Sequence, residues 1–269
     1  MKYTNLYLAL IGRTSLFAKT TTADIAISLL QEADLDWFLA PDSSTPQKLV
    51  EDMGSDQLPE NFDELPGKVK DWFKKKILFS AQKGWFYEEF GMQLSDMMSS
   101  GGVMSDFRGL FRKLDDCPER YEAATISRGV DFVVRPYLSL LATMTPADLR
   151  PHAQGGSSLW GDGYLARFAL VAANDASIKN CHFPREKRVF PSRLVDGLKE
   201  WHNHLGMHEY EIVSSNNGEK AIKVQGPVGQ TMNIKNDVFD AVESYRSGLR
   251  GLIVENKTYD LDGNYSRFH

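Results

Sequence analysis

The sequence predicts an α/β fold in three layers, with a sheet of buried strands and helices on both faces. Short apolar runs alternate with segments of helical periodicity through the first part of the chain, which is typical of this class. The run Tyr137–Met144 is almost continuously apolar, as expected for a central strand buried on both faces. An apolar content of 42% and a charged content of 25% fit a globular protein with a sizeable core.

The elements are predicted from apolar periodicity and from local start and stop signals. We expect strands at 6–11, 36–40, 77–80 and 84–88, and helices at 20–33, 45–53, 69–76, 90–99 and 103–114. Thr45 followed by Pro46 is a helix start, because threonine caps free amides and proline suits the first helical position.

The second half of the chain contains a predicted hairpin, and its pattern of predicted elements then changes. Residues 120–126 and 130–134 are strand-like runs around Ser127-Arg128-Gly129, a turn signature. Residues 164–173 form a further apolar run. Beyond about Asn174 we expect helices at 191–205 and 238–254, with short strands at 209–213, 221–224 and 231–234. These patterns predict a core over 1–175 and a small α+β appendage over 176–269.

Charge and cysteine content limit the function classes. A net charge of −5 excludes a protein whose whole surface binds nucleic acid. The lysines at 70–76 and the basic residues at 179–188 are either solvated faces or loops, or local basic patches. Two distant cysteines predict neither a disulfide framework nor a zinc site. Without a long apolar run or a signal layout, we expect a cytoplasmic chain with no membrane contact.

The strongest functional motif follows the first apolar run. Residues 6–11 predict a buried strand, 12–18 a loop, and Lys19 and Thr20 the start of a helix. Backbone amides at a helix N-terminus and one lysine can hold a triphosphate, and the threonine hydroxyl can ligate Mg²⁺. The predicted cofactors are therefore ATP and Mg²⁺. The predicted contacts are Gly12, Arg13, Thr14, Ser15, Ala18, Lys19, Thr20 and Thr21.

This loop departs from the usual P-loop pattern G-x-x-x-x-G-K-[ST]. Five residues separate Gly12 from Ala18 in place of four, and Ala18 replaces the second glycine. Glycine normally allows the backbone to approach a phosphate closely. An ordinary strand–turn–helix corner that contains Lys-Thr is therefore an open alternative.

A nucleotide site also needs carboxylates, and Glu88 and Glu89 directly follow the apolar run that ends in Trp85-Phe86-Tyr87. At the carboxyl end of a strand, Glu88 would belong to the Mg²⁺ shell and Glu89 would polarise the attacking water. A strand end with solvent-facing glutamates is the alternative.

Two further residues are catalytic candidates. Thr143, at the end of the central run, is a candidate sensor of the γ-phosphate, or it simply precedes the Thr145 cap. Arg167 is isolated in an apolar segment and needs an anionic partner. It is either a finger for the transferring phosphoryl group, within the chain or across a subunit interface, or a member of an internal ion pair, for example with Asp162.

Taken together, these motifs resemble the RecA-like P-loop ATPases of phages, plasmids and integrated elements that accompany primase domains. The resemblance covers most of the chain through motifs in a fixed order: Gly12-Arg13-Thr14-Ser15, Ala18-Lys19-Thr20-Thr21, Tyr87-Glu88-Glu89-Phe90-Gly91, Thr125-Ile126-Ser127-Arg128, Pro136-Tyr137-Leu138-Ser139, Asp162-Gly163-Tyr164-Leu165-Ala166-Arg167-Phe168 and Tyr265-Ser266-Arg267-Phe268. It departs from the family at Ala18, where glycine is standard, and at Glu88, where aspartate is common.

The resemblance implies a RecA-like sheet, ATP with Mg²⁺, and a helicase-like role in replication of a mobile element. Its implied partners are single-stranded DNA, a primase or other replication domain, and further copies in a homo-oligomeric ring. A helical region would follow His269. A module that binds nucleotide without hydrolysis, with a structural role in a replication or defence complex, is the alternative, and a phosphotransferase ranks below both.

Overall fold

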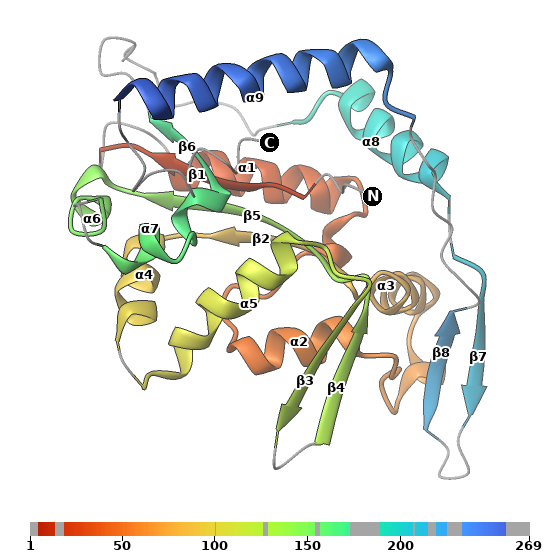
Figure 1. The fold of residues 1–269 in the computed structure, drawn as a ribbon. Coiled ribbons are helices and arrows are strands. Elements are labelled where there is room, and N and C mark those ends of the chain that lie inside the picture. The colour runs from red at the N-terminus through yellow and green to blue at the C-terminus, as the bar shows by residue number, and fades with distance from the viewer. Residues whose placement is uncertain are drawn as a thin grey trace.

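A four-stranded parallel sheet forms the centre of the molecule (Figure 1). Its strands are β1 (Tyr7–Ile11), β2 (Gln82–Tyr87), β5 (Tyr137–Met144) and β6 (Phe168–Ala172), in the order β2-β5-β1-β6. The computed structural model describes residues 5–13, 19–99, 101–125, 129–153, 157–172, 189–206, 208–214, 219–224 and 233–256.

The parallel register of the sheet gives it two distinct edges, one at each end of the strands. β1 pairs on one side with β5, from Tyr7 opposite Leu140, and on the other side with β6, from Tyr7 opposite Phe168. Because all pairs are parallel, the last residues of every strand meet at one edge, which we call the carboxyl edge. The opposite edge is the amino edge.

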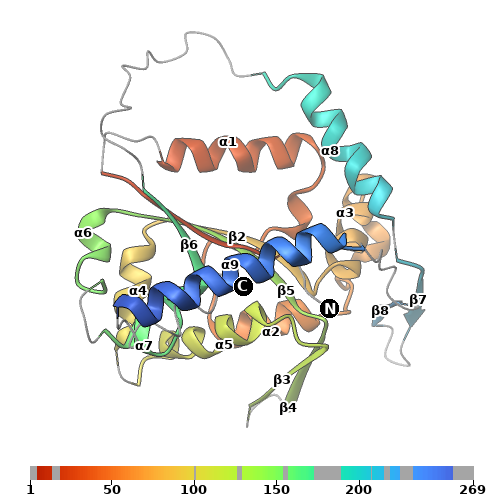
Figure 2. The ribbon, with the colours of Figure 1, turned by 45° about the horizontal axis from the view of Figure 1, so that its top comes forward.

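Helices lie on both faces of this sheet, as predicted (Figures 1 and 2). The helix α1 (Lys19–Glu32) lies on one face, whereas α9 (Asn236–Asn256) lies on the β6 side of the sheet. The other face is covered by α2 (Pro46–Gly54), α4 (Phe90–Met98) and α5 (Asp106–Asp115). The chain is thus a mixed α/β protein with a parallel sheet between helical layers.

The main core fills the space between the sheet and α5. The side chains of Tyr7, Ala9 and Ile11 in β1 all point into the core, because side chains along a strand alternate between its two faces. Tyr7 is 1% exposed and packs edge-on against Phe111, while its hydroxyl donates to the Phe111 carbonyl at 3.0 Å. A buried hydroxyl without such an acceptor would destabilise the fold, so this bond fixes α5 against β1.

A second buried cluster joins the last part of the chain to the first. It contains Val195 from α8 (Ser192–Leu205) and Ile222 from the hairpin of β7 (Tyr210–Ser214) and β8 (Lys220–Val224), packed with Trp37 and Ile77. The amide of Ile222 also donates to the Asp56 carbonyl at 2.8 Å. The segment predicted as an appendage therefore shares a buried cluster with α3 (Gly67–Leu78).

Several predicted elements are confirmed by the structure. Thr45 caps α2 by accepting from the amide of Lys48, and Pro46 is its first residue. The strands β3 (Arg120–Thr125) and β4 (Gly129–Val134) pair as the expected hairpin. The short helices α6 (Pro146–Leu149) and α7 (Ser158–Gly161), with 3₁₀ turns at Asp36–Phe38, Phe62–Glu64, Val103–Ser105 and Leu165–Arg167, complete the described elements.

Two predicted strands are wrong. Residues 77–80 were expected to be a strand, but Ile77 and Leu78 continue α3 and bury their side chains in the second cluster. Residues 36–40 were also expected to be a strand, but Asp36–Phe38 form a 3₁₀ turn and only Leu39 bridges to Gly84 in parallel. The Trp37 indole of this turn donates to the Asp34 carbonyl at 3.0 Å. The predicted strand 231–234 falls partly outside the described residues.

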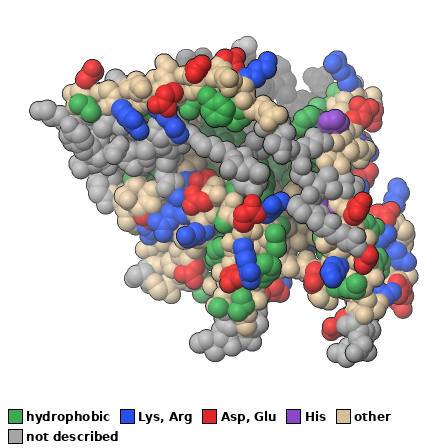
Figure 3. Space-filling view, turned by 45° about the vertical axis from the view of Figure 1, so that its right-hand side comes forward, with side chains coloured by type: hydrophobic (Ala, Val, Ile, Leu, Met, Phe, Trp, Pro, Cys, Tyr) green, Lys and Arg blue, Asp and Glu red, His purple; other side chains and the backbone are tan. Residues whose placement is uncertain are grey.

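Exposed apolar side chains gather on two projecting elements (Figure 3). On α9 they include Phe239, which is 56% exposed, and on the β3–β4 hairpin they include Val130, which is 63% exposed. None of the helices in the described part of the chain is both long and apolar enough to cross a membrane.

Lys83 on β2 is a charged residue in an apolar position. Its side chain points to the same face as the buried Trp85, and the residue is only 4% exposed. Burial, together with the charge of Lys76, lowers the pKa of Lys83 from its usual value near 10.5 to about 8. At neutral pH the folded chain therefore keeps an ammonium group in an unfavourable environment.

We predict that Lys83→Met stabilises the protein at pH 7 by about 1–3 kcal/mol, because a straight apolar side chain avoids this desolvation. The folded pKa lies below the unfolded one, so the unfolded wild type binds more protons between about pH 8 and 10.5. Wild-type stability therefore rises with pH in that window, and the advantage of the variant shrinks. Urea titrations at pH 7 and pH 10 measure this.

The exposed Lys113 offers a matched control. Lys113→Met should change the free energy of unfolding by no more than about 0.5 kcal/mol at either pH. An advantage of Lys83→Met that is the same at both pH values would contradict the explanation.

Candidate functional site

The carboxyl edge brings together most of the residues that the sequence singled out. Gly12 follows β1, and its amide donates to the Met144 carbonyl of β5 at 3.1 Å. Tyr87 of β2 pairs with Ala142, so Glu88 follows at the level of Thr143. The strands β1, β5 and β2 thus end side by side, and Thr143 of β5 lies between the end of β1 and the end of β2.

Thr143 is 5% exposed and lies opposite Leu10 in the register. Alternation along β5 places its side chain on the face opposite to Ala142 and Leu140, which belong to the main core. That is the face on which α1 lies (Figure 2). Thr143 therefore lies beneath α1, one residue before the end of its strand.

The helix α1 is described from Lys19 onward, and Thr20 and Thr21 in its first described turn are exposed. No acidic side chain occupies that first turn. The N-terminal amides and the positive end of the helix dipole are thus not neutralised by a carboxylate of that turn, which suits an anion. Thr14, Ser15 and Ala18 lie outside the described residues, whereas Arg13 is exposed at the end of β1.

Glu88 is exposed, yet its surroundings disfavour the charged form. Partial desolvation and the nearby charges of Asp24, Glu89 and Asp42 raise the pKa of Glu88 above its usual value. The influence of Asp24 ties Glu88 to α1, because Asp24 lies one turn after Thr20. A cation bound at this edge would relieve the repulsion between these carboxylates.

Glu89 adopts a backbone conformation that is uncommon for a residue with a side chain. Its φ of 50° and ψ of 39° are left-handed, and it occupies the cap position of α4 without a side-chain capping bond. Such strain is often found at functional positions and requires rigid surroundings. Phe90, which is fully buried, provides that anchor directly after the turn.

A close contact at Gly91 fixes this turn against the end of β5. A Cβ atom at Gly91 would lie 2.3 Å from the Asp148 Cβ, so only glycine fits. Asp148 is itself held by a capping box, in which its carboxylate accepts from the Thr145 amide at 2.9 Å and from the Thr145 hydroxyl at 2.7 Å. The strand ends of β2 and β5 are thus joined through α4 and α6.

Arg167 does not lie at this edge. It directly precedes β6 and therefore lies at the amino edge, where its Nε is 3.1 Å from Asp115 of α5. It also donates to the Gly163 carbonyl at 2.7 Å, and its side chain is 6% exposed. This arrangement matches the internal ion pair and not a finger within the same chain. The suggested partner Asp162 was wrong, because Asp162 pairs with Arg108.

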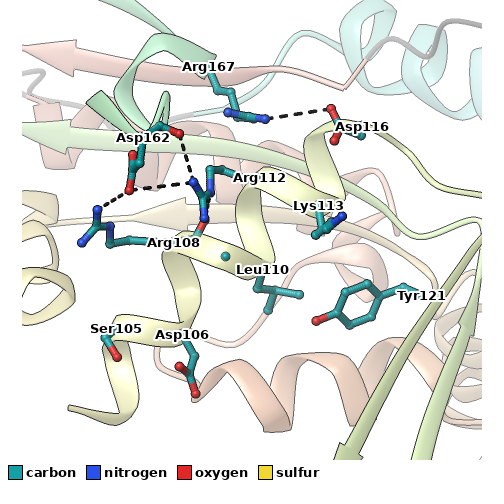
Figure 4. Close-up of a pocket in the computed structure, with 11 residues that line it drawn as sticks. Ser105, Asp106, Arg108, Leu110, Arg112, Lys113, Asp116, Tyr121, Asp162 and Arg167 are labelled. Atoms are coloured by element: carbon teal, nitrogen blue, oxygen red, sulfur yellow. Dashed lines mark hydrogen bonds and ion pairs between the residues drawn. The ribbon is translucent and has the colours of Figure 1, made fainter. Parts of the chain in front are cut away.

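A polar cleft of about 760 Å³ surrounds these charges on the α5 side of the sheet (Figure 4). Arg108 and Arg112, one turn apart on α5, both donate to Asp162. Arg108 donates to the side-chain carboxylate of Asp162, and Arg112 donates to the backbone carbonyl of Asp162 at 3.0 Å. Neither arginine was predicted to be a site residue, although their spacing of four on an amphipathic helix is visible in the sequence. Asp162, Asp115 and the Gly163 carbonyl thus hold the three arginines of this cleft in an internal network of ion pairs and hydrogen bonds.

No group of three or more histidine, cysteine, aspartate or glutamate side chains in the described ranges is arranged to hold a metal ion. Comparisons with family models, with curated proteins and with solved structures found no match for this chain.

We predict that Gly91→Ala destabilises the fold by about 1–3 kcal/mol, because the added methyl group must displace Asp148 and its capping box. Chemical denaturation measures this change. Gly109→Ala on α5 is the control, since a Cβ there meets nothing within 4 Å. It should leave stability unchanged or raise it by up to about 1 kcal/mol through helix propensity. Equal effects at both positions would contradict the proposed contact.

Proposed function

We propose that this chain is a RecA-like P-loop domain that binds ATP and hydrolyses it with Mg²⁺, as a helicase-like component of mobile-element replication. The observation that carries the proposal is the shared carboxyl edge. There Gly12 follows β1, the buried Thr143 is the penultimate residue of β5, and the pair Glu88–Glu89 follows β2, and these three strands are neighbours. Ligands of open α/β sheets bind outside the carboxyl ends of the strands.

Each group has a role that its chemistry suits. Lys19 and the amides of the first turn of α1 would bind the phosphates, with Thr20 as a Mg²⁺ ligand. Glu88 would join the Mg²⁺ shell through water, and the bound cation would relieve the repulsion that raises its pKa. Glu89 would orient the attacking water, and Thr143, below α1, would sense the γ-phosphate.

The remaining parts of the proposal rest on the resemblance of the sequence motifs. These parts are single-stranded DNA as a partner, a primase or other replication domain nearby, and assembly into a homo-oligomeric ring. The proposed cytoplasmic location rests instead on the cysteine content and the hydropathy pattern of the sequence. Arg167 has no catalytic role in the proposal, because Asp115 already binds its guanidinium.

Nucleotide binding without hydrolysis is the second candidate, and the loop favours it. Ala18 replaces a glycine and the loop is one residue longer than usual, which alters how closely the backbone can approach a phosphate. A phosphate-release assay with and without single-stranded DNA separates the two candidates.

We predict that Lys19→Ala weakens ATP binding by about 100-fold or more, because charged hydrogen bonds to the phosphates are lost. Titration with a fluorescent ATP analogue measures the affinity. Lys113→Ala removes the same charge on α5, far from α1, and should bind like the wild type. Wild-type affinity in Lys19→Ala would refute the phosphate site.

We predict that Glu89→Gln binds ATP normally but releases phosphate about 100-fold or more slowly, since an amide cannot accept the proton of the attacking water. The change is isosteric and preserves the left-handed turn. The exposed Glu60→Gln is the matched control and should retain turnover. Unchanged phosphate release by Glu89→Gln would assign the base to another residue.

A further inference from the structure

The helix α3 carries a concentration of positive charge that contrasts with the rest of the chain. Its twelve residues, GKVKDWFKKKIL, contain five lysines and one aspartate, whereas the whole chain has a net charge of −5. Three residues separate the end of this helix from the start of β2, so α3 lies next to the amino edge of the sheet (Figure 1). This face is therefore separate from the candidate nucleotide site.

The lysines of α3 differ in whether they have an ion-pair or hydrogen-bond partner. Lys74 pairs with Asp71 at 3.4 Å, and Lys70 donates to the Asp63 carbonyl at 2.7 Å. Within the described ranges, no acidic side chain lies within ion-pair distance of Lys68 or Lys75. Two lysines on one helix are thus available for an external anion.

Both of these lysines line a pocket of about 460 Å³ between α3 and the turn that follows α1. Trp72, Trp37 and Val69 supply its apolar wall, and Asp34 and Asp71 complete the lining. Each of the two aspartates has a cation of its own: Asp34 pairs with Lys199 at 3.3 Å, and Asp71 pairs with Lys74. The remaining charge of the pocket is therefore positive.

Trp72 is a rigid ring at this pocket. Its indole Nε1 donates to the Asp36 carboxylate at 3.3 Å, and Phe73 packs edge-on at a centroid distance of 5.1 Å. Lys76 lies 4.9 Å from the ring centroid, within cation–π distance. A ring that is already fixed loses little entropy when a flat ligand stacks on it.

We infer that the α3 face binds single-stranded nucleic acid, with backbone phosphates on Lys68 and Lys75 and one unpaired base in the pocket beside Trp72. Basic residues next to an aromatic platform are the two components of strand binding without sequence preference. A duplex keeps its bases stacked and presents only phosphates, so it can use the lysines but not the pocket. The choice of nucleic acid as the occupant rests on the proposed function, whereas the site itself is independent of ATP.

The test is fluorescence anisotropy with a labelled 12-mer oligonucleotide, as DNA and as RNA, single-stranded and as a duplex, in nucleotide-free buffer. The single strand should bind the full chain at least about 10-fold more tightly than the duplex. The double variant Lys68→Ala/Lys75→Ala should lose about 10-fold or more in affinity. The salt dependence of its binding should also flatten by about 1.4 in logarithmic slope, as for two lost phosphate contacts.

The double variant Lys113→Ala/Lys235→Ala removes the same charge from other exposed positions and should bind like the wild type. Trp72→Leu retains an apolar side chain but cannot stack, and should lose about 5-fold or more for a single strand with no change for a duplex. Equal losses in both double variants, equal affinity for duplex and single strand, or no binding by the wild type would overturn the inference.

The Lys19→Ala variant separates this site from the nucleotide site. It should bind the oligonucleotide like the wild type even though its ATP affinity is lost. Normal oligonucleotide binding by a chain that proves unable to bind ATP would leave the α3 site standing and refute the proposed function alone. Loss of oligonucleotide binding in Lys19→Ala would contradict the separation.

Discussion

The pairing of β1 between β5 and β6 is the constraint on which the rest of the structure depends. A parallel strand flanked on both sides must be covered on both faces, and the aromatic side chains of β1 and α5 meet this need on one of them. The same pairing brings the turn after β1 level with the end of β5. The pairing of β1 therefore determines both the packing of the core and the position of the candidate site.

The two edges of the sheet are used differently. At the amino edge, arginine and aspartate side chains neutralise one another, as with Arg167 and Asp115, and the charges are stabilised within the fold. At the carboxyl edge, carboxylates face one another near the uncompensated start of α1, and the backbone at Glu89 is strained. A phosphate with its cation would improve the charge distribution at the carboxyl edge.

The strands of the sheet and most helices could be predicted from the sequence, because the periodicity of apolar residues and helix capping are local properties of the chain. It failed where tertiary packing decides, as at Ile77 and Leu78, whose apolar character suits a buried strand or a buried helix end equally. It located Lys19, Thr143 and Glu88 through their places after apolar runs. It could not give the partner of Arg167, since Asp115 lies far away in the chain, nor the need for glycine at position 91, which only the neighbour Asp148 explains.

The order of the strands also governs how this chain can acquire its fold. The segment at β1 meets the segment at β5 across 133 residues, as in the bond from the Leu6 amide to the Ser139 hydroxyl. During synthesis the apolar residues of β1 therefore stay unpaired until β5 has left the ribosome. Non-local pairing of this kind is slow, because a large loop must close before the strands make stabilising contacts. Until then β1 exposes an unpaired apolar strand, the kind of segment through which chains associate.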